Sequence, residues 1–195
     1  MKVFTHFLLW NLGLASAETQ TTEAERESLA RHASGKKHLA EIGVWHGVTT
    51  CRLRSAMSPD GTLVAIDPYP TGRLHFSAQR VIARREVSKI PSGSVRWVRK
   101  TGAEAANHLV CAGSEQFDFV FIDGDHSYEG LKGDWLGWSG LVAACGVVGL
   151  HDSRPTATRR IENAGSVRFT RDVILQDPRF EVVDEVDSLT MLRRK

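Results

Sequence analysis

Side chains capable of acid–base or metal chemistry follow an apolar run near residue 120. Residues 117–122 read FDFVFI and the next four read DGDH, so Asp123, Asp125 and His126 stand close together. A nearly unbroken run of aromatic and β-branched residues is typical of a central parallel strand covered by helices on both faces. Ligands of open α/β sheets bind beyond the carboxyl ends of the strands. We therefore predict that these three side chains border a site, although Asp125 or Ser127 would also suit the cap of the following helix.

A second apolar run ends in the same way. Residues 142–150 are mostly apolar and are followed by His151 and Asp152. Because neighbouring parallel strands end at the same edge of a sheet, both polar clusters are predicted to face one crevice. Two carboxylates at close range repel unless a proton or a cation lies between them, so a bound cation would keep both ionised.

A glycine-rich turn follows an earlier predicted strand. Residues 39–43, which include Glu41, lead into a turn that contains Gly43 and Gly47 and opens a helix. Such a turn brings a ligand against bare backbone and the N–H groups of the helix. Its spacing is neither the GxGxxG of dinucleotide sites nor a phosphate loop that ends in Gly-Lys-Ser/Thr.

The next predicted strand ends in an acid. Residues 62–66 read TLVAI and are followed by Asp67. A carboxylate at the end of the second strand of such a unit is placed to accept both hydroxyls of a ribose. The plainer interpretation is a turn acid before Pro68. Together with the glycine-rich turn, Asp67 indicates a nucleoside ligand.

Strands and helices alternate along the chain as a doubly wound α/β fold requires. We predict a Rossmann-like, mostly parallel sheet that closes with an antiparallel pair at residues 179–186 and 188–193. The other predicted strands are residues 39–43, 62–66, 94–100, 117–122 and 142–150, and the predicted helices are residues 18–34, 48–57, 76–90, 104–111, 128–141 and 156–176. Trp135 and Trp138 lie three positions apart and are predicted to be core rather than a platform for substrate.

Composition places the chain among ordinary globular proteins. It has 195 residues, of which 42% are hydrophobic and 25% charged, enough for one full core. A net charge of +2 with scattered arginines argues against a nucleic-acid partner. The cysteines Cys51, Cys111 and Cys145 are odd in number and lie in apolar contexts, so we predict buried thiols in a reducing compartment.

The first 36 residues are predicted to form a helical cap on a domain that comprises residues 37–195. Residues 1–17 resemble a secretory signal, with one basic residue, an apolar run and small residues before a cleavage point. The preferred interpretation is an amphipathic helix with one apolar face, made of Phe4, Phe7, Leu8 and Trp10. The run is too short and too polar to span a bilayer, so we predict no membrane partner. We expect a cytoplasmic protein and a homodimer contact through the N-terminal helices.

Five motifs in order give the chain a family likeness. They are EIGVWHGVTT, LVAIDPY, KTGAEA, FDFVFIDGDHSYEG and GVVGLHDS. Through them the chain from residue 39 onward resembles the class I S-adenosylmethionine-dependent methyltransferases, and among these the small-molecule O-methyltransferases with a DGDHSYE motif. The first motif alone is weak, whereas five at successive strand ends are specific. The resemblance implies a seven-stranded sheet with the last strand antiparallel.

The resemblance implies a seat for S-adenosyl-L-methionine, carried over position by position. The methionine part falls to Glu41, Gly43 and Gly47, the ribose to Asp67, and the adenine to Gly102, Ala103 and Glu104, with Asp123 beside them. Every one of these residues lies at a predicted strand end or at the start of a helix.

The metal-dependent branch of the family also implies a divalent cation, Mg²⁺ or Mn²⁺. Its ligands here would be Asp123, His151 and Asp152. His151 departs from the branch's frequent Asp-Asp or Asp-Asn pair, and an imidazole shifts the preference toward softer ions such as Mn²⁺ or Fe²⁺. The alternative roles for His151 are a base or a neighbour of the ligands.

The implied reaction is O-methylation of a small-molecule hydroxyl. In-line displacement needs alignment and a deprotonated nucleophile. His126 and Asp125 are the base candidates, and His126 ranks first because an unperturbed pKa of about 6.5 suits neutral pH. Two alternatives stay open: a metal-independent methyltransferase of the same fold, and a non-catalytic cofactor-binding or assembly subunit. A nucleic-acid methyltransferase is disfavoured by the charge and by the lack of an Asn/Asp-Pro-Pro-Tyr motif.

Overall fold

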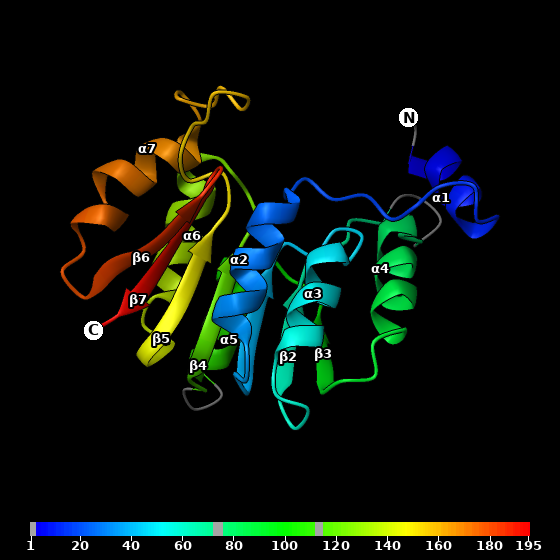
Figure 1. Cartoon of the computed structure of the whole chain (residues 1–195), viewed down its shortest axis with the longest axis horizontal. Coiled ribbons are helices and arrows are strands. Elements are labelled where there is room, and N and C mark those ends of the chain that lie inside the picture. Colours follow the sequence, from blue (N-terminus) through cyan, green and yellow to red (C-terminus); the bar gives the residue numbers. More distant parts are fainter. Residues whose placement is uncertain (1–2, 72–75, 112–114) are drawn as a thin grey trace.

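The computed structural model describes residues 3–71, 76–111 and 115–195, and within them a seven-stranded sheet lies between two layers of helices (Figure 1). The strands are β1 (His38–Ile42), β2 (Thr62–Ile66), β3 (Ser94–Val98), β4 (Phe117–Ile122), β5 (Val142–Leu150), β6 (Phe180–Val186) and β7 (Leu189–Arg194). The helices are α1 (Val3–Asn11), α2 (Glu23–Ala33), α3 (Val48–Ala56), α4 (Ala78–Ser88), α5 (Gly102–Cys111), α6 (Tyr128–Trp138) and α7 (Gly165–Asp172), followed by a short 3₁₀ helix, η1 (Ile174–Gln176).

The sheet has the topology that the sequence predicts. Its strand order is β3-β2-β1-β4-β5-β7-β6, and β7 runs antiparallel to both of its neighbours. Pairing is parallel from β3 across to β5, and Ala40 of β1 lies between Val64 of β2 and Val120 of β4. The mostly parallel sheet with an antiparallel last strand is therefore confirmed. Its order places the carboxyl ends of β2, β1, β4 and β5 in a row.

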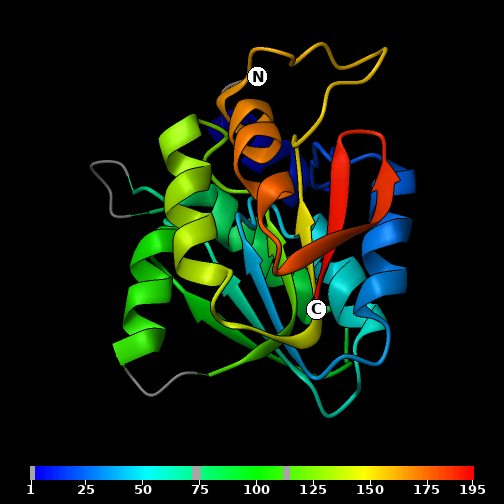
Figure 2. The ribbon, with the colours of Figure 1, turned by 90° about the vertical axis from the view of Figure 1, so that its left-hand side faces the viewer.

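Both faces of the sheet are covered, as the apolar run of β4 predicts. Side chains alternate along a strand, so Phe119 and Phe121 pack in one core with α2 and α3, whereas Val120 and Ile122 pack in another with α5 and α6. Figure 2 shows these helix pairs on opposite sides of the sheet. Trp135 and Trp138 are buried in the second core, so they serve the core rather than a substrate.

The predicted helix at residues 156–176 is wrong in its first half. Only α7 and η1 are helical there, and the residues before α7 form a loop. The loop is closed by turns, because Thr156 donates its N–H to the carbonyl of Arg159 at 3.0 Å and its hydroxyl accepts the N–H of Arg159 at 2.9 Å. Threonine hydroxyls compete in this way with helical hydrogen bonds.

The predicted apolar face of the N-terminal helix α1 turns inward only in part, through Trp10 and the half-buried Phe7. His6 and Trp10 are its buried residues, whereas Phe4 and Leu8 are exposed. The Trp10 indole donates a hydrogen bond to Glu86 of α4 at 2.8 Å, so polar contacts as well as apolar ones hold α1 in place. Met1 and Lys2 of the signal-like segment lie outside the described residues. Among those that are described, no helix is both long and apolar enough to cross a bilayer.

The three cysteines are free thiols, but they are not all buried as predicted. Cys111 and Cys145 are exposed, and Cys51 is half-buried. Cys111 is the last residue of α5, and Cys145 lies within β5 at a stretch that leaves the sheet ladder, so both point away from the cores.

Candidate functional site

A cavity of about 620 Å³ lies at the carboxyl ends of β1, β2 and β4, within the size range of small-ligand sites. Its floor is built by the turns that follow these strands. Its roof includes Glu18, Thr19 and Gln20, from the segment that crosses above the sheet between α1 and α2 (Figure 1). Of the predicted site residues, those that line the cavity are Gly43, Asp67, Gly102, Ala103, Asp123, Asp125 and His126.

Gly43 is required by a close approach of two turns. Its φ is +86°, a left-handed conformation that suits glycine, and a Cβ at this position would overlap the carbonyl oxygen of Asp123. The Asp123 N–H donates to the carbonyl of Ile42 at 2.7 Å, which holds the two turns together. The bare backbone of Gly43 therefore forms part of the cavity floor.

Asp67 organises the turn after β1 as well as facing the cavity. One carboxylate oxygen accepts the N–H groups of Val44 at 3.1 Å and Trp45 at 3.0 Å, and the other accepts the N–H of Tyr69 at 2.8 Å. A carboxylate has about four acceptor positions, so roughly one stays free for a ligand hydroxyl. Binding of both ribose hydroxyls by Asp67 remains a prediction.

Two other predicted cofactor residues do not line the cavity. The Glu104 carboxylate accepts the N–H and the hydroxyl of Thr101, both at 2.9 Å, and so caps the start of α5. Gly47 adopts a left-handed φ of +78° at the start of α3 and packs against α4. Both residues shape the turns that carry the cavity walls.

Glu41 lies behind the cavity rather than in it. Its side chain is fully buried, and neither carboxyl oxygen has a hydrogen-bond partner among the described residues. Burial raises the pKa of Glu41 well above its usual range, and the nearby charges of Asp123 and Asp67 raise it further. Burial therefore favours the neutral form of Glu41 beneath the glycine-rich turn.

Asp134 is a cavity residue that the sequence analysis missed. It lies on α6, is only 5% exposed, and its carboxylate is next to Gly102 and Gly124, where a Cβ would overlap it or crowd it. Burial and the charge of Asp125 raise the pKa of Asp134 to about 6, although a hydrogen bond from the Ala103 backbone acts in the opposite direction. The sequence signal that could have identified Asp134 is its position next to the predicted core residue Trp135, in a helix that contains several glycines.

His126 lies between the two predicted acids. Its Nε2 is 3.1 Å from Oδ1 of Asp123, and its Nδ1 is 2.8 Å from Oδ2 of Asp152. Hydrogen bonds with Asp123 and Asp152 raise the pKa of His126 to about 9, although burial acts in the opposite direction. The imidazole is therefore charged at neutral pH, which removes the argument that ranked it first on an unperturbed pKa.

His151 is also held between carboxylates, and one of them was not predicted. Its Nδ1 is 2.7 Å from Oδ1 of Asp123, and its Nε2 is 3.5 Å from Oε2 of Glu25 on α2. Burial lowers the pKa of His151, but Asp123 and Glu25 outweigh it and raise that pKa to about 10. Conversely, burial alone would raise the pKa of Glu25, whereas His151 and hydrogen bonds from Thr22 and Ser188 bring it down to about 2.

Asp152 has a cation of its own from the loop before α7. The Arg159 guanidinium lies 2.6 Å from Oδ2 of Asp152, the oxygen that also contacts His126. Burial raises the pKa of Asp152, but His126, His151 and Arg159 together lower it to about 2. Three carboxylates of this cluster thus face three cationic groups.

The predicted metal ligands Asp123, His151 and Asp152 do not converge on one point. Asp123 contacts Nδ1 of His151, whereas Oδ1 of Asp152 lies 3.9 Å from Nε2, the opposite nitrogen of the same ring. At this edge of the sheet, ligand atoms of Asp123, His126 and His151 all lie within 4.8 Å of one another. A cation at this edge would therefore be held by one carboxylate and two imidazoles.

The cap interpretation of Asp125 and Ser127 is observed. Asp125 Oδ1 accepts the N–H of Ser127 at 2.9 Å, and the Ser127 hydroxyl accepts the N–H of Gly130 at 3.0 Å. Ser127 is therefore the N-cap of α6, while Asp125 both stabilises that turn and lines the cavity.

Comparison with known proteins links this site to one family. The family model described as a methyltransferase domain matches residues 40–153, which run from β1 to the residues just after β5. A Mycobacterium leprae protein catalogued as a candidate O-methyltransferase is 30% identical over 130 residues, and a Mycobacterium avium one is 35% identical over 98 residues. These matches cover 64% and 50% of this chain but only 51% and 40% of the relatives, so the chain spans about half of their length.

Solved structures share the fold. The O-methyltransferase from Bacillus cereus, in complex with S-adenosylhomocysteine, superposes with a TM-score of 0.62 at 20% identity and covers 100% of this chain and 91% of its own. TomG from Streptomyces achromogenes, an O-methyltransferase of tomaymycin synthesis in complex with S-adenosylmethionine, gives 0.65 at 16% identity, with 100% and 90% covered. At these identities the likeness concerns the fold alone.

Proposed function

Because this chain belongs to the methyltransferase-domain family, we propose that it transfers the methyl group of S-adenosylmethionine to a hydroxyl oxygen of a small molecule. The observation that carries this proposal is the position of His126. It borders the cavity at the ends of β1, β2 and β4 and is paired with a buried carboxylate on its far side. A methyl donor in the cavity and a hydroxyl beside it would both lie within reach of this imidazole.

The cavity floor offers contacts for S-adenosylmethionine, the proposed methyl donor. The methionine part would lie on the bare backbone of Gly43, one ribose hydroxyl would use the free acceptor position of Asp67, and the adenine would lie against Gly102 and Ala103. Asp67→Ala should weaken binding of S-adenosylhomocysteine by about 1.5–3 kcal/mol, the value of a hydrogen bond to a charged group. Isothermal titration of the folded variant checks this, and unchanged affinity would remove Asp67 from the site.

The proposed methyl transfer needs one base, which accepts the proton of the substrate hydroxyl. An oxygen–carbon bond forms as the sulfur–carbon bond breaks in line, the sulfonium leaves as a neutral thioether, and the hydroxyl proton passes to the base. When His126 is neutral and keeps the N–H that faces Asp152, its Nε2 lone pair would accept the hydroxyl proton, while Asp152 holds the ring in place. Oδ1 of Asp123 lies 3.1 Å from this Nε2, so the substrate hydroxyl would have to displace that contact. A carboxylate that orients a histidine base is a recurrent catalytic arrangement.

The test combines binding and turnover. Purified chain is assayed for S-adenosylhomocysteine binding and then for methyl transfer to a panel of phenolic and sugar hydroxyls. His126→Ala should lower kcat by roughly 10²–10⁴ while leaving the Kd of the cofactor product nearly unchanged. An intact chain that binds no S-adenosylhomocysteine would refute the proposal, and an unchanged kcat in His126→Ala would remove the base.

A cation-assisted form is favoured by one further observation, the proximity of Asp123, His126 and His151. The donor types fit a divalent cation such as Mn²⁺ or Fe²⁺, which would lower the pKa of a bound substrate hydroxyl. His126 would then be a ligand, and Asp125 would be the remaining base candidate. Turnover that survives exhaustive chelation, with elemental analysis showing no metal, selects the metal-independent form. Turnover that is lost and then restored by Mn²⁺ selects the cation-assisted one.

The remaining expectations about partners are also proposals. We propose a cytoplasmic enzyme with a small-molecule acceptor, without a nucleic-acid or membrane partner. A homodimer through α1 is proposed on the exposed apolar side chains of its outer side, such as Phe4 and Leu8. Size-exclusion chromatography with light scattering checks the dimer, and a monomer at all concentrations would discard it.

A further inference from the structure

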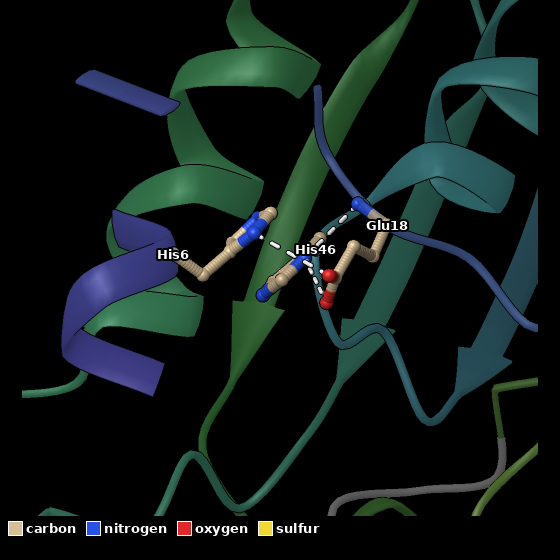
Figure 3. A group of neighbouring side chains, drawn as sticks. All are labelled: His6, Glu18 and His46. Atoms are coloured by element: carbon tan, nitrogen blue, oxygen red, sulfur yellow. Dashed lines mark hydrogen bonds and ion pairs between the residues drawn. The ribbon is translucent and has the colours of Figure 1, made fainter. Parts of the chain in front are cut away.

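A second cluster of side chains that could bind a metal ion lies away from the cluster around Asp123. Figure 3 shows His6 from α1, Glu18 from the segment before α2, and His46 from the turn after β1 directed toward one another. These residues are far apart in the sequence and are brought together when α1 packs beside the cavity. None of them belongs to the cluster around Asp123.

The geometry of the three side chains places their ligand atoms close together. The two imidazole rings are parallel within 5°, with centroids 5.1 Å apart. One Glu18 oxygen is 3.3 Å from Nδ1 of His6, and the other is 4.0 Å from Nδ1 of His46. All three ligand atoms lie within 4.8 Å of one another, a span that one ion and small side-chain rotations can close.

The burial of His6 is unexplained by the fold alone. His6 is only 4% exposed, and neither of its ring nitrogens has a hydrogen-bond partner among the residues that the structure describes. Buried polar groups without partners are rare and costly, and each calls for a ligand, a water or an ion. Nδ1 of His6 lies 3.3 Å from an oxygen of the Glu18 carboxylate without forming a hydrogen bond to it.

The state of the other two residues suits a cation. Burial lowers the pKa of His46 and the neighbouring His6 lowers it further, although Glu18 acts in the opposite direction, so the neutral imidazole, which has one lone-pair nitrogen, is favoured. At present Nδ1 of His46 accepts the N–H of Glu18 at 3.1 Å, and an ion would replace that contact. The Glu18 side chain is 46% exposed, which leaves a path from solvent and open positions for water.

We propose that His6, Glu18 and His46 form a binding site for a divalent transition-metal ion of the zinc type. Two imidazole nitrogens and one carboxylate are a ligand set that binds Zn²⁺ with a further position open for water. Imidazole-rich sets disfavour Mg²⁺ and Ca²⁺, which select oxygen ligands.

An ion at this site would clamp the roof of the cavity to its floor. Glu18 lines the cavity from above, and Trp45, which lines it from below, stacks on the His46 ring with centroids 4.7 Å apart. Metal binding would therefore hold α1 and the crossing segment against the glycine-rich turn. This inference concerns the N-terminal segment and does not depend on which acceptor is methylated.

The experiment measures zinc and segment ordering separately from activity. The intact chain, with its terminus verified by mass spectrometry, is stripped with chelator and titrated with Zn²⁺ against a chromophoric competitor. Amide hydrogen exchange of residues 3–22 is followed with and without Zn²⁺. The variants are His6→Ala and Glu18→Gln, and the matched control is His108→Ala, a histidine exposed on α5.

We expect wild type and His108→Ala to bind Zn²⁺ and to exchange more slowly at residues 3–22 when it is present. His6→Ala should weaken this binding at least 100-fold, since loss of residues that merely support a ligand already costs about 10–100-fold. Glu18→Gln, which keeps both imidazoles, should also weaken zinc binding, but by less than His6→Ala does. Asp123→Asn should leave the zinc-dependent protection of residues 3–22 in place.

Two results would overturn the proposal. Wild-type zinc affinity in both His6→Ala and Glu18→Gln would show that these residues are not ligands. Zinc binding that Asp123→Asn abolishes and His6→Ala retains would assign the ion to the catalytic cluster instead. If zinc binds through His6 but exchange at residues 3–22 does not change, the clamp is refuted.

Discussion

The charge state of His126 would set the pH dependence of the proposed methyl transfer. With a pKa of about 9, its neutral fraction is small at physiological pH. That fraction is about 1% at pH 7 and about 10% at pH 8, because each pH unit below the pKa reduces the neutral form tenfold. If neutral His126 is the base, kcat should rise about tenfold per pH unit from pH 6 to 8 and level off near pH 9.

Asp152→Asn tests the cause of that pKa. The variant removes one of the two carboxylates that contact His126, and a nearby opposite charge shifts a pKa by about 1–3 units. Asp123 remains, so we expect the midpoint of the kcat profile to fall by about 1–2 units, from about 9 toward 7–8. The plateau can also fall, since Asp152 orients the ring, but the midpoint reports the charge.

Asp125→Asn is the matched control. It makes the same charge change next to the cavity, but Asp125 has no hydrogen bond to His126. Its midpoint should therefore move much less than that of Asp152→Asn. The His126 ring resonance, followed by NMR titration, gives the same pKa without turnover. A wild-type midpoint below pH 7, or equal shifts in the two variants, would refute the reasoning.

Other consequences of the structure can be measured on stability and binding. The pKa values of His126 and His151 are raised in the folded state to about 9 and about 10, so their contribution to stability is complete below about pH 6.5 and is lost as pH rises through 9 to 10. Thermal unfolding from pH 6 to 10.5 should show this decline, and a flat profile would contradict it. Gly43→Ala should cost at least about 1–3 kcal/mol and abolish S-adenosylhomocysteine binding, because a Cβ would strike the carbonyl at the end of β4. Glu25→Gln should cost about 1.5–3 kcal/mol in denaturant unfolding, with the exposed Glu27→Gln as control. Equal stabilities of the two glutamine variants would show that the charge of Glu25 contributes nothing.

The strand ends were predictable because the signal is local. An apolar run that stops at Asp67 or Asp123 marks both a buried strand and its exposed carboxyl end, and the parallel order then fixes which ends meet. The length of the helix before β6 was not predictable in this way. Its early turns are replaced by hydrogen bonds within the loop and by the contact of Arg159 with Asp152, which depends on distant segments.

The unpredicted parts of the site share a different cause. Glu25, Asp134 and Arg159 reach the cavity or the charged cluster around Asp123 from helices or loops, where the sequence around them has an ordinary surface or core pattern. Their effect is large because it is electrostatic: Glu25 and Arg159 help to set the pKa values of His151 and Asp152. Propensity and periodicity carry no information about such long-range pairs.

A residue of α2 belongs to the charged cluster around Asp123, so α2 cannot be removed without disturbing that cluster. The sequence predicts a helical cap over residues 1–36, and the matched family model begins at residue 40. Yet Glu25 lies 3.5 Å from His151 and also accepts the N–H of Ser188 at 2.9 Å. A chain trimmed to residues 37–195 would leave the buried cation of His151 with one counter-charge fewer and the N-terminal end of β7 untied. The matched family model is thus shorter than the set of residues that determines the charges of the site. Transfer of the matched segment alone to another scaffold would carry Asp123 and His151 without the carboxylate of Glu25 that raises the pKa of His151.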